Sequence, residues 1–400
     1  MSGTQISGVR ESPARIPKLT SSVHNIGAEK PPFGSRFLTE QSDVWTQNAW
    51  DHVPPPDDQA ESIARSLEKQ RVAPVPVEEK EKYNAKPAKY WDNFYKTNAD
   101  NFFRDRKWLH LEFPELVAVA EKDAGNVTIC EVGCGAGNTA FPLLLENKNP
   151  KLSIHAFDYS SHAVKLVQAN PLYHDPPFGS IQAAVWDLST ENSLPPGIHL
   201  ESVDIVVLVF VLSALHPDEW TRAVCNIHRM LKPGGVVLLR DYGRYDLTQL
   251  RFKSGRLLED NFYIRGDKTR VYFFELDELA LIFTGTRASF TQMTLKTVEV
   301  IDESQENPLN GSVSPTLDLQ DPEQLRQHAS EDLPTPQVEA IIHPTLLKPL
   351  AAHVPHPLFV IDQLGVDRRL LINRKRQLKM YRVWMQGRFK KNDSDEPRTL

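Results

Sequence analysis

Between residues 127 and 240, short apolar segments alternate with stretches of helical periodicity, and this alternation limits the fold more than any other feature of the chain. The apolar segments are typical of buried strands, and they lie at residues 127–132, 151–158, 181–186, 204–210 and 236–240. Helices are predicted between them at residues 140–146, 161–168 and 217–231. Strands that alternate with helices in this way form a parallel, doubly wound α/β sheet.

The rest of the chain is predicted to be arranged around this unit. Residues 358–361 and 377–389 are expected to form a final antiparallel pair of strands. Thirty prolines and a mean hydropathy of -0.40 indicate long unfolded segments. We predict a disordered N-terminus (1–32), a peripheral arm (33–88), one domain (89–391) interrupted by a disordered, Pro-rich insertion at about 284–355, and a disordered tail (392–400).

Composition excludes several classes of protein. The three cysteines, Cys130, Cys134 and Cys225, are too few for a disulfide framework and form no CxxC pair of the kind found in zinc sites, so no metal is expected. The N-terminus lacks the apolar stretch of a secretory signal, and the longest apolar run, residues 205–212, is too short to cross a bilayer. We expect a soluble protein without a membrane partner, in the cytoplasm and with the nucleus as a second location.

A glycine-rich loop with the sequence EVGCGAGN (residues 131–138) follows the first predicted strand. Glycines such as Gly133 and Gly135 let the backbone turn sharply and approach a ligand closely at the start of a helix. Dinucleotide-binding proteins use a related arrangement, and many ordinary turns contain glycines. The loop alone therefore leaves the identity of the ligand open.

Two carboxylates at the ends of the next two strands narrow the choice of ligand. Asp158 can accept hydrogen bonds from both hydroxyls of a ribose, although an Asp before a helix can also cap that helix. Asp187 can accept from the amino group of an adenine, and the backbone amide of Leu188 can face the ring. A surface Asp is the ordinary alternative for either residue alone. Because the loop lacks a phosphate-binding Lys, the three features in this order indicate S-adenosylmethionine.

Basic residues are concentrated in two places, although the formal net charge of the chain is -6. Arg104 and Arg106 lie in a segment dense in aromatic residues. Basic residues among aromatics are suited to a lid over a cofactor or to a surface that stacks bases; the ordinary alternative is a helix that packs its aromatic side chains on the edge of the sheet. Near the C-terminus, basic and apolar residues alternate on predicted strands, which suits a surface that tracks phosphates, although a solvated run of charges is the ordinary alternative. The residues predicted there to bind RNA are Arg368, Arg369, Arg374, Lys375 and Arg376.

These segments also carry a resemblance to a known family. FFRDRKW (residues 102–108) and VDRRLLINR (366–374) resemble the tRNA cytidine-N3 methyltransferases of the methyltransferase-like group, whereas EVGCGAGN is common to class I methyltransferases in general. The resemblance covers roughly residues 33–283 and 358–391. It implies the class I methyltransferase (Rossmann-like) fold, with a mostly parallel sheet that ends in an antiparallel hairpin.

By this resemblance, Trp91 and Tyr95 would close over S-adenosylmethionine, and Val209 would line the pocket for its adenine. The implied substrate is a cytidine at the first position of the anticodon loop, in tRNAs such as those for threonine and serine. The implied partner is thus the anticodon stem-loop of a tRNA, and a tRNA synthetase or another accessory protein is a candidate second partner.

Neutral cytosine carries an in-plane lone pair on N3, so methylation needs alignment of an unpaired base rather than prior deprotonation. Because the product is positively charged, a nearby carboxylate is expected to stabilise the transition state. We predict Asp105 and Asp241 as the catalytic residues.

Three alternatives stay open. A methyltransferase that acts on a protein or a small molecule would share the fold but would not need the basic C-terminal segment. A non-catalytic RNA-binding subunit would keep the fold without activity, although the intact glycine loop, Asp158 and Asp187 argue against it. The arm and the insertion could also serve a structural or interaction role beside catalysis.

Overall fold

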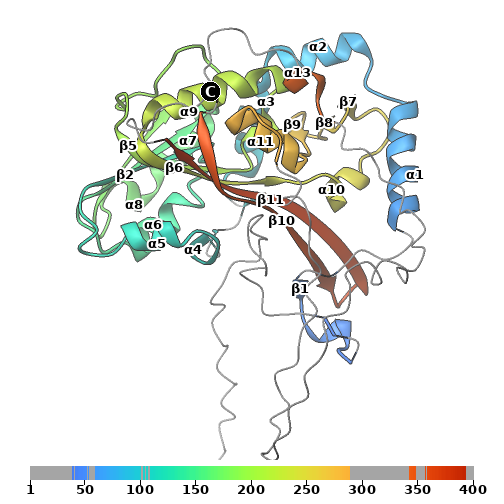
Figure 1. The fold of residues 1–400 in the computed structure, drawn as a ribbon, viewed down its shortest axis with the longest axis horizontal. Helices are drawn as coiled ribbons and strands as arrows, with labels where there is room; N and C mark the ends of the chain where they lie inside the picture. The colour runs from blue at the N-terminus through green and yellow to red at the C-terminus, as the bar shows by residue number, and fades with distance from the viewer. Residues whose placement is uncertain are drawn as a thin grey trace, which may run out of the picture.

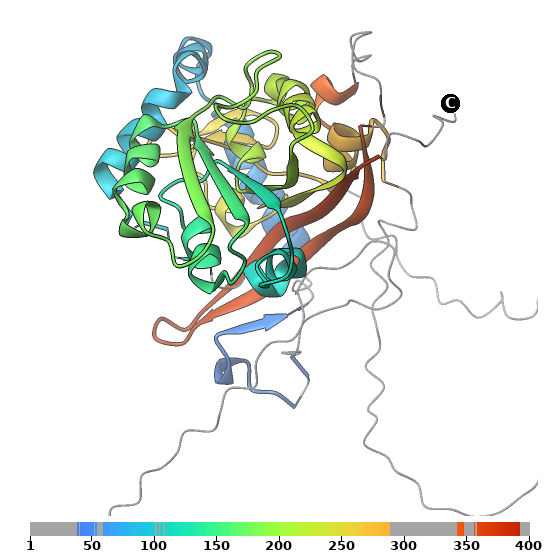
Figure 2. The same ribbon diagram turned by 90° about the vertical axis from the view of Figure 1, so that its left-hand side faces the viewer.

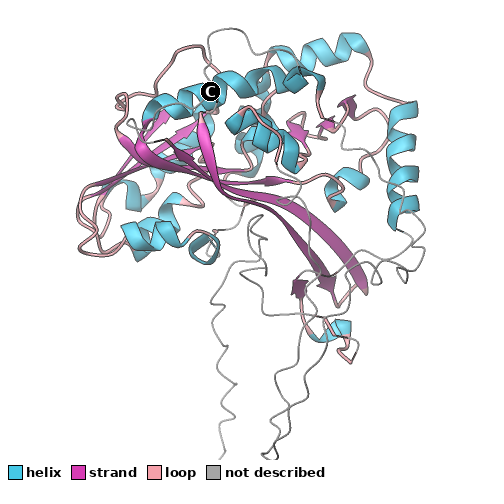
Figure 3. Ribbon diagram, viewed as in Figure 1, coloured by secondary structure: helices cyan, strands magenta, loops and turns pink. Residues whose placement is uncertain are grey.

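The computed structural model describes residues 38–39, 41–51, 53, 59–100, 102–103, 105–106, 109–288, 342–347, 356 and 358–392. Their main body is a twisted central sheet with helices on both faces (Figures 1 and 3). The predicted disordered N-terminus, most of the predicted insertion and most of the predicted tail lie outside the described residues.

The central sheet has eight strands in the order β1-β10-β11-β6-β5-β2-β3-β4. Five of them run parallel: β2 (Val127–Val132), β3 (Leu152–Asp158), β4 (Ser180–Val185), β5 (Val203–Val209) and β6 (Leu231–Tyr242). The antiparallel strands are β10 (Phe359–Asn373), β11 (Leu378–Lys391) and the edge strand β1 (Ala49–Asp51). The predicted fold, a mostly parallel α/β sheet with a terminal antiparallel hairpin, is confirmed.

Two apolar cores lie on opposite faces of this sheet, because successive side chains of a strand point to opposite sides. Val206 and Leu208 of β5 point into one core, and Ile205 and Val207 point into the other. The helices of the first core are α9 (Trp220–Met230) and α11 (Leu276–Thr284). The helices of the second core are α4 (Leu109–Glu112), α5 (Pro114–Val119), α6 (Ala140–Glu146) and α7 (Ser161–Ala169).

A small antiparallel sheet follows the carboxyl end of β6. Its strands are β7 (Leu257–Glu259), β8 (Phe262–Ile264) and β9 (Arg270–Tyr272), and α10 (Leu247–Leu250) precedes them. The Phe274 amide donates to the Tyr242 carbonyl at 2.9 Å, which joins the small sheet to the end of β6. Ligands of open α/β sheets bind beyond the carboxyl ends of the strands, so this sheet stands beside the expected site.

Segments that precede β2 wrap around the domain. The helices are α1 (Gln59–Val72), α2 (Val77–Ala85) and α3 (Pro87–Asn98). Gln70 of α1 is buried, donates to the Gln249 carbonyl at 2.9 Å and accepts from the Tyr263 hydroxyl at 2.8 Å. Further out, Trp50 of β1 packs on Leu370 of β10, and β1 lies beside the outer part of the β10–β11 hairpin (Figure 2). The described part of the predicted arm thus docks on the domain.

Three elements differ from their predicted bounds. β6 begins at Leu231 rather than at residue 236, because residues 232–235 form an irregularity within the strand. β10 and β11 are 15 and 14 residues long, and most of the basic C-terminal segment lies on them. Within the predicted insertion, the structure describes α13 (Pro344–Leu347), and the preceding His343 amide donates to Glu278 of α11 at 2.9 Å.

Candidate cofactor and acceptor site

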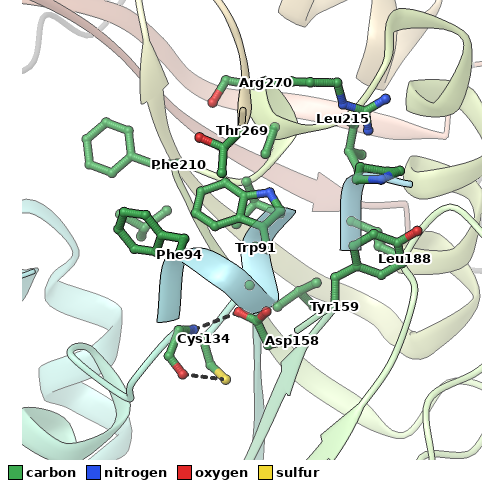
Figure 4. Close-up of a pocket in the computed structure, with 18 of the residues that line it drawn as sticks. Trp91, Phe94, Cys134, Asp158, Tyr159, Leu188, Phe210, Leu215, Thr269 and Arg270 are labelled. Carbon is green, nitrogen blue, oxygen red and sulfur yellow. Dashed lines mark hydrogen bonds between the residues drawn. The ribbon is translucent and has the colours of Figure 1, made fainter. Parts of the chain in front are cut away.

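A cavity of about 300 Å³ lies at the carboxyl ends of the five parallel strands β2 to β6 (Figure 4). Loops after parallel strands meet at this edge, which is where open α/β sheets bind ligands. α3 and the turn between β8 and β9 complete the wall. All residues predicted to bind the cofactor line the cavity: Trp91, Tyr95, Gly133, Gly135, Asp158, Asp187, Leu188 and Val209.

The glycine loop approaches α3 too closely for a side chain. Gly135 has φ +56°, in the left-handed region that favours glycine. A Cβ atom there would lie 2.6 Å from the Tyr95 hydroxyl oxygen. A glycine at this position therefore lets Tyr95 close directly over the loop.

Asp158 is held by the backbone on both of its oxygens. Oδ2 accepts from the Gly135 amide and Oδ1 from the Ser160 amide, each at 2.8 Å. Ser160 caps α7 through its own side chain, so Asp158 is not the cap of that helix. The residue is 8% exposed, and burial raises the pKa of its carboxyl to about 6. Each oxygen keeps further acceptor capacity for a hydroxyl of a ligand.

The adjoining wall has the groups expected around an adenine. Oδ1 of Asp187 accepts from the amide and hydroxyl of Ser189, at 2.8 and 2.7 Å. Leu188 is buried beside it. In Figure 4, Tyr159 and Leu188 lie on one side of Trp91. This part of the cavity therefore combines apolar and aromatic surface with a fixed carboxylate.

α3 forms a lid whose aromatic face points into the cavity. Trp91 and Tyr95 stack with ring centroids 6.2 Å apart, and Tyr95 is buried, which raises the pKa of its hydroxyl well above the usual value. Asp92, between them in the chain, accepts from the Ser160 hydroxyl at 2.7 Å and from the His162 amide at 3.2 Å. The lid is thus attached to the start of α7, next to Asp158.

The far end of the cavity is aromatic. The rings of Phe210, after β5, and Tyr242, at the end of β6, lie 4.7 Å apart. Phe210 has φ +62°, and such a conformation costs a residue with a side chain about 1–2 kcal/mol. The Phe210 amide donates to the Arg240 carbonyl at 2.8 Å, which helps to hold the strained residue in place. Strain of this kind is concentrated at functional sites.

Arg106, predicted to bind RNA, lies in the cavity wall instead. Its Nη1 donates to the Thr139 hydroxyl at 2.9 Å and lies 3.6 Å from Oε1 of Glu131, and its guanidinium stands 6.0 Å from the Phe210 ring centroid. Burial raises the pKa of Glu131 to about 7. Arg106 is therefore placed to act on a ligand inside the cavity rather than on an outer RNA surface.

Neither predicted catalytic carboxylate lines the cavity. Asp105 is exposed and accepts from Nδ2 of Asn138 at 3.3 Å. Asp241 is buried, accepts from the amides of Ser213 and Tyr242 at 3.0 and 2.8 Å, and has a pKa that burial raises to about 6. Since Ser213 and Tyr242 both line the cavity, this placement favours a positioning role for Asp241.

Arg369, another predicted RNA-binding residue, belongs to a buried charge network. It lies within ion-pair distance of Asp51 of β1, Glu112 of α4 and Asp367 of β10, at 3.4, 3.2 and 3.3 Å. Arg240 of β6 also pairs with Asp367. These contacts argue against the prediction that Arg369 binds RNA, because the strand alternation turns this side chain toward the domain.

The tip of the β10–β11 hairpin keeps its basic residues at the surface. Lys375 and Arg376 are exposed, whereas Arg374 donates to Asn48 beside β1 at 2.7 Å. Arg368 is half-buried, and burial lowers the pKa of its guanidinium. Arg104 lies outside the described residues.

The turn between β8 and β9 is part of the cavity wall, which no feature of the sequence predicted. The lining residues from this segment are Arg265, Asp267, Thr269 and Arg270. They follow the last parallel strand, where the alternation of strands and helices no longer indicates which loops meet. No local motif marks them either.

The part of the chain that the structure describes has neither a cluster of metal ligands nor a membrane-spanning helix. No three or more His, Cys, Asp or Glu side chains are grouped so that they could hold a metal ion. No helix is long and apolar enough to cross a membrane.

The chain is similar to several known proteins. A methyltransferase domain family matches residues 130–237. The tRNA(Thr) (cytosine(32)-N(3))-methyltransferase of Saccharomyces cerevisiae is 43% identical over 366 residues, which are 91% of this chain and 46% of that protein. The chain thus spans about half the length of this relative.

Other relatives are matched over most of their length. The tRNA N(3)-methylcytidine methyltransferase trm140 of Schizosaccharomyces pombe is 40% identical over 375 residues, 94% of this chain and 97% of that protein. The human tRNA N(3)-cytidine methyltransferase METTL2B is 37% identical over 324 residues, 64% of this chain and 85% of that protein. The chain therefore belongs to the family of tRNA N(3)-cytidine methyltransferases, which use S-adenosylmethionine.

Proposed function

We propose that this protein methylates N3 of cytidine 32, in the anticodon loop of a threonine tRNA. The observation that carries the proposal is the 43% identity, over 91% of this chain, to the Saccharomyces protein named for this activity. The Schizosaccharomyces relative, which the chain covers almost completely, is named for the same modification of tRNA. Acceptance of serine tRNA, and help from a tRNA synthetase or another accessory protein, stay predictions.

The residues of the cavity fit S-adenosylmethionine. Asp158 has acceptor capacity left for ribose hydroxyls, and Asp187 and Leu188, which line the same cavity, would recognise the adenine. Behind the glycine loop, the buried Glu131 lies 3.6 Å from Arg106 and accepts from the Ala140 amide at 3.0 Å, so a charged pair stands beside the loop. When bound, S-adenosylmethionine supplies a methyl group on a sulfonium centre, which a neutral lone pair can accept.

The chain itself would orient the acceptor base and exclude water. N3 of cytosine lies on the pairing edge, so the nucleotide must enter the cavity unpaired. The aromatic pair of Phe210 and Tyr242 offers a surface for the base, and the lid residues Trp91 and Tyr95 shield the opposite side from solvent. Asp241, which does not itself line the cavity, would hold Ser213 and Tyr242 in position by accepting hydrogen bonds from their amides.

The RNA itself would extend from the cavity toward basic surface. Lys375 and Arg376 at the exposed hairpin tip are the best placed of the predicted RNA-binding residues, because no described acid pairs with them. Contacts from such residues to phosphates would position the anticodon stem-loop without reading its sequence.

Label transfer tests the proposal directly. The purified chain is incubated with methyl-labelled S-adenosylmethionine and individual tRNA transcripts, and the labelled nucleoside is identified after digestion. We expect 3-methylcytidine in threonine tRNA, and no label with the Asp158→Asn variant. Label in protein or in another nucleoside, or no label in any tRNA, would contradict the proposal.

A further inference from the structure

The charged side chains of the cavity wall differ in whether the protein itself provides them with partners. Arg106, Glu219 and Arg270 form ion pairs, and Asp158 accepts backbone hydrogen bonds on both oxygens, whereas Asp187 accepts only on Oδ1. Two more charged side chains of the wall, Arg265 and Asp267, lie on the turn between β8 and β9. Among the described residues, the Arg265 guanidinium has no hydrogen-bond or ion-pair partner, and only Oδ1 of Asp267 accepts a hydrogen bond.

The turn nevertheless holds both side chains in defined places. The Arg265 amide donates to the Thr269 carbonyl at 2.8 Å, and the Lys268 amide donates back to the Arg265 carbonyl at 3.0 Å. Oδ1 of Asp267 accepts from the amide and hydroxyl of Thr269, at 2.9 and 2.7 Å, which leaves Oδ2 available. The Arg265 guanidinium lies 5.4 Å from the Tyr242 ring centroid.

Arg265 lies at the end of the cavity formed by Phe210 and Tyr242, which we call its acceptor half. The groups that suit ribose and adenine, Asp158 and Asp187, stand at the ends of β3 and β4. Arg265 stands over Tyr242, at the end of β6 and on the other side of β2 and β5 in the sheet. The Arg265 guanidinium is therefore placed for the methyl acceptor rather than for the adenosine of the cofactor, and the exposed Asp267, two residues along the same turn, lines the same cavity.

Cytosine presents a complementary pattern on its pairing edge. The amino group on C4 is a donor and O2 is an acceptor, and N3 lies between them. A carboxylate is a suitable partner for the cytosine amino group, and a guanidinium is a suitable donor to a base oxygen. Uracil would place an oxygen, O4, against the carboxylate and would carry a hydrogen on N3.

We propose that Asp267 and Arg265 read the two ends of the cytosine pairing edge, Asp267 through the C4 amino group and Arg265 through O2, and leave N3 free. This inference rests on the proposed function. Positive charge that develops on the base as N3 gains a methyl group spreads to the C4 amino group. A carboxylate at that group therefore favours the reaction as well as selecting the base.

A double-mutant cycle between enzyme and RNA tests the role of Asp267. Anticodon stem-loops carry either cytidine or its 2-pyrimidinone analogue, which lacks the C4 amino group, and single-turnover methylation rates are measured at saturating cofactor. Asp267→Ala is expected to slow methylation of cytidine by about tenfold to a hundredfold, because a charge-assisted hydrogen bond is lost. On the analogue, where that bond is already absent, the same variant should slow the rate by less than about threefold.

Two controls separate this role from a general loss of structure. Asp260→Ala removes an exposed carboxylate of the same small sheet, which lies 3.8 Å from Arg71 and outside the cavity, and it should leave both rates unchanged. Asp267→Asn keeps an acceptor for Thr269 and should also show the selective loss, to a smaller degree. Arg265→Gln is tested in the same way with 2-thiocytidine, which replaces O2 with a weaker acceptor.

The outcomes distinguish the inference from the function on which it rests. Equal loss of rate on cytidine and analogue would overturn the inference and indicate a contact to phosphate or to the fold. Weaker cofactor binding in parallel with the lost rate would assign the pair to the cofactor and also overturn it. If the unsubstituted protein methylates no cytidine in any tRNA, the proposed function fails as well.

Discussion

Replacing Gly135 with Ala should loosen the lid over the cofactor. The new Cβ would lie 2.6 Å from the Tyr95 hydroxyl oxygen, about 1 Å inside ordinary contact distance. Tyr95 cannot turn away easily, because it is buried and packed against Trp91 and Phe94. Overpacking of this kind costs about 1–3 kcal/mol, and opening of the lid would relieve it. Cofactor binding, which needs the closed lid, should then weaken by about fivefold to a hundredfold.

Calorimetric titration with S-adenosylhomocysteine measures this effect, and Gly255→Ala is the matched control. Gly255 has φ +74°, and a Cβ atom added to it would have no neighbour within 4 Å among the described residues. The two variants therefore share the strain of a left-handed alanine, about 1–2 kcal/mol of unfolding free energy, but only Gly135→Ala meets the lid. Gly255→Ala should bind the ligand normally.

A second substitution tests the cause. Tyr95→Phe removes the hydroxyl, after which the nearest ring atom, Cζ, lies 3.4 Å from the new Cβ. In the Gly135→Ala background, Tyr95→Phe should therefore restore much of the lost affinity. Normal binding by Gly135→Ala alone, or no recovery in the double variant, would refute the closed-lid geometry.

Four further perturbations have defined outcomes. Because burial raises the pKa of Asp158 to about 6, cofactor affinity should fall about tenfold per pH unit below that value, which a binding titration at each pH measures. The folded state holds the proton more tightly than the unfolded state. The cofactor-free protein should therefore lose unfolding free energy as pH rises through about 4 to 6, which denaturant unfolding measures. Arg369→Ala should cost about 3 kcal/mol of unfolding free energy, because it breaks the buried charge network. Lys375→Ala should leave the melting temperature unchanged, because the side chain is exposed, and should weaken tRNA binding in a filter assay. Asp92→Ala should raise the KM for the cofactor by about tenfold with a smaller change in kcat, because it detaches α3 from α7; an unchanged KM would contradict the attachment.

The parallel part of the fold was predictable because its signal is local and repeated. The strand ends that carry Asp158 and Asp187 follow directly from the alternation of apolar and helical segments, and parallel strands bring their carboxyl ends together. The sequence therefore sufficed to predict that these residues line one cavity at this edge of the sheet.

The acceptor half of the site was less predictable, because it depends on contacts between distant segments. Asp241 lies near the end of a parallel strand, as a site residue would, but it is buried, accepts from the Ser213 amide and does not line the cavity. Arg369 has the composition of an RNA-binding residue, yet its partners come from β1 and α4. Arg265 and Asp267 reach the cavity through a turn that no periodicity marks.

Methylation of threonine tRNA transcripts that differ only at position 32 tests the central claim most directly. The purified chain is incubated with S-adenosylmethionine and either the cytidine 32 or the uridine 32 transcript, and 3-methylcytidine is located by fragment mass spectrometry. The structure and the family relationship predict one 3-methylcytidine, at position 32, in the first transcript and none in the second. Methylation at another position, or of both transcripts equally, would contradict the account.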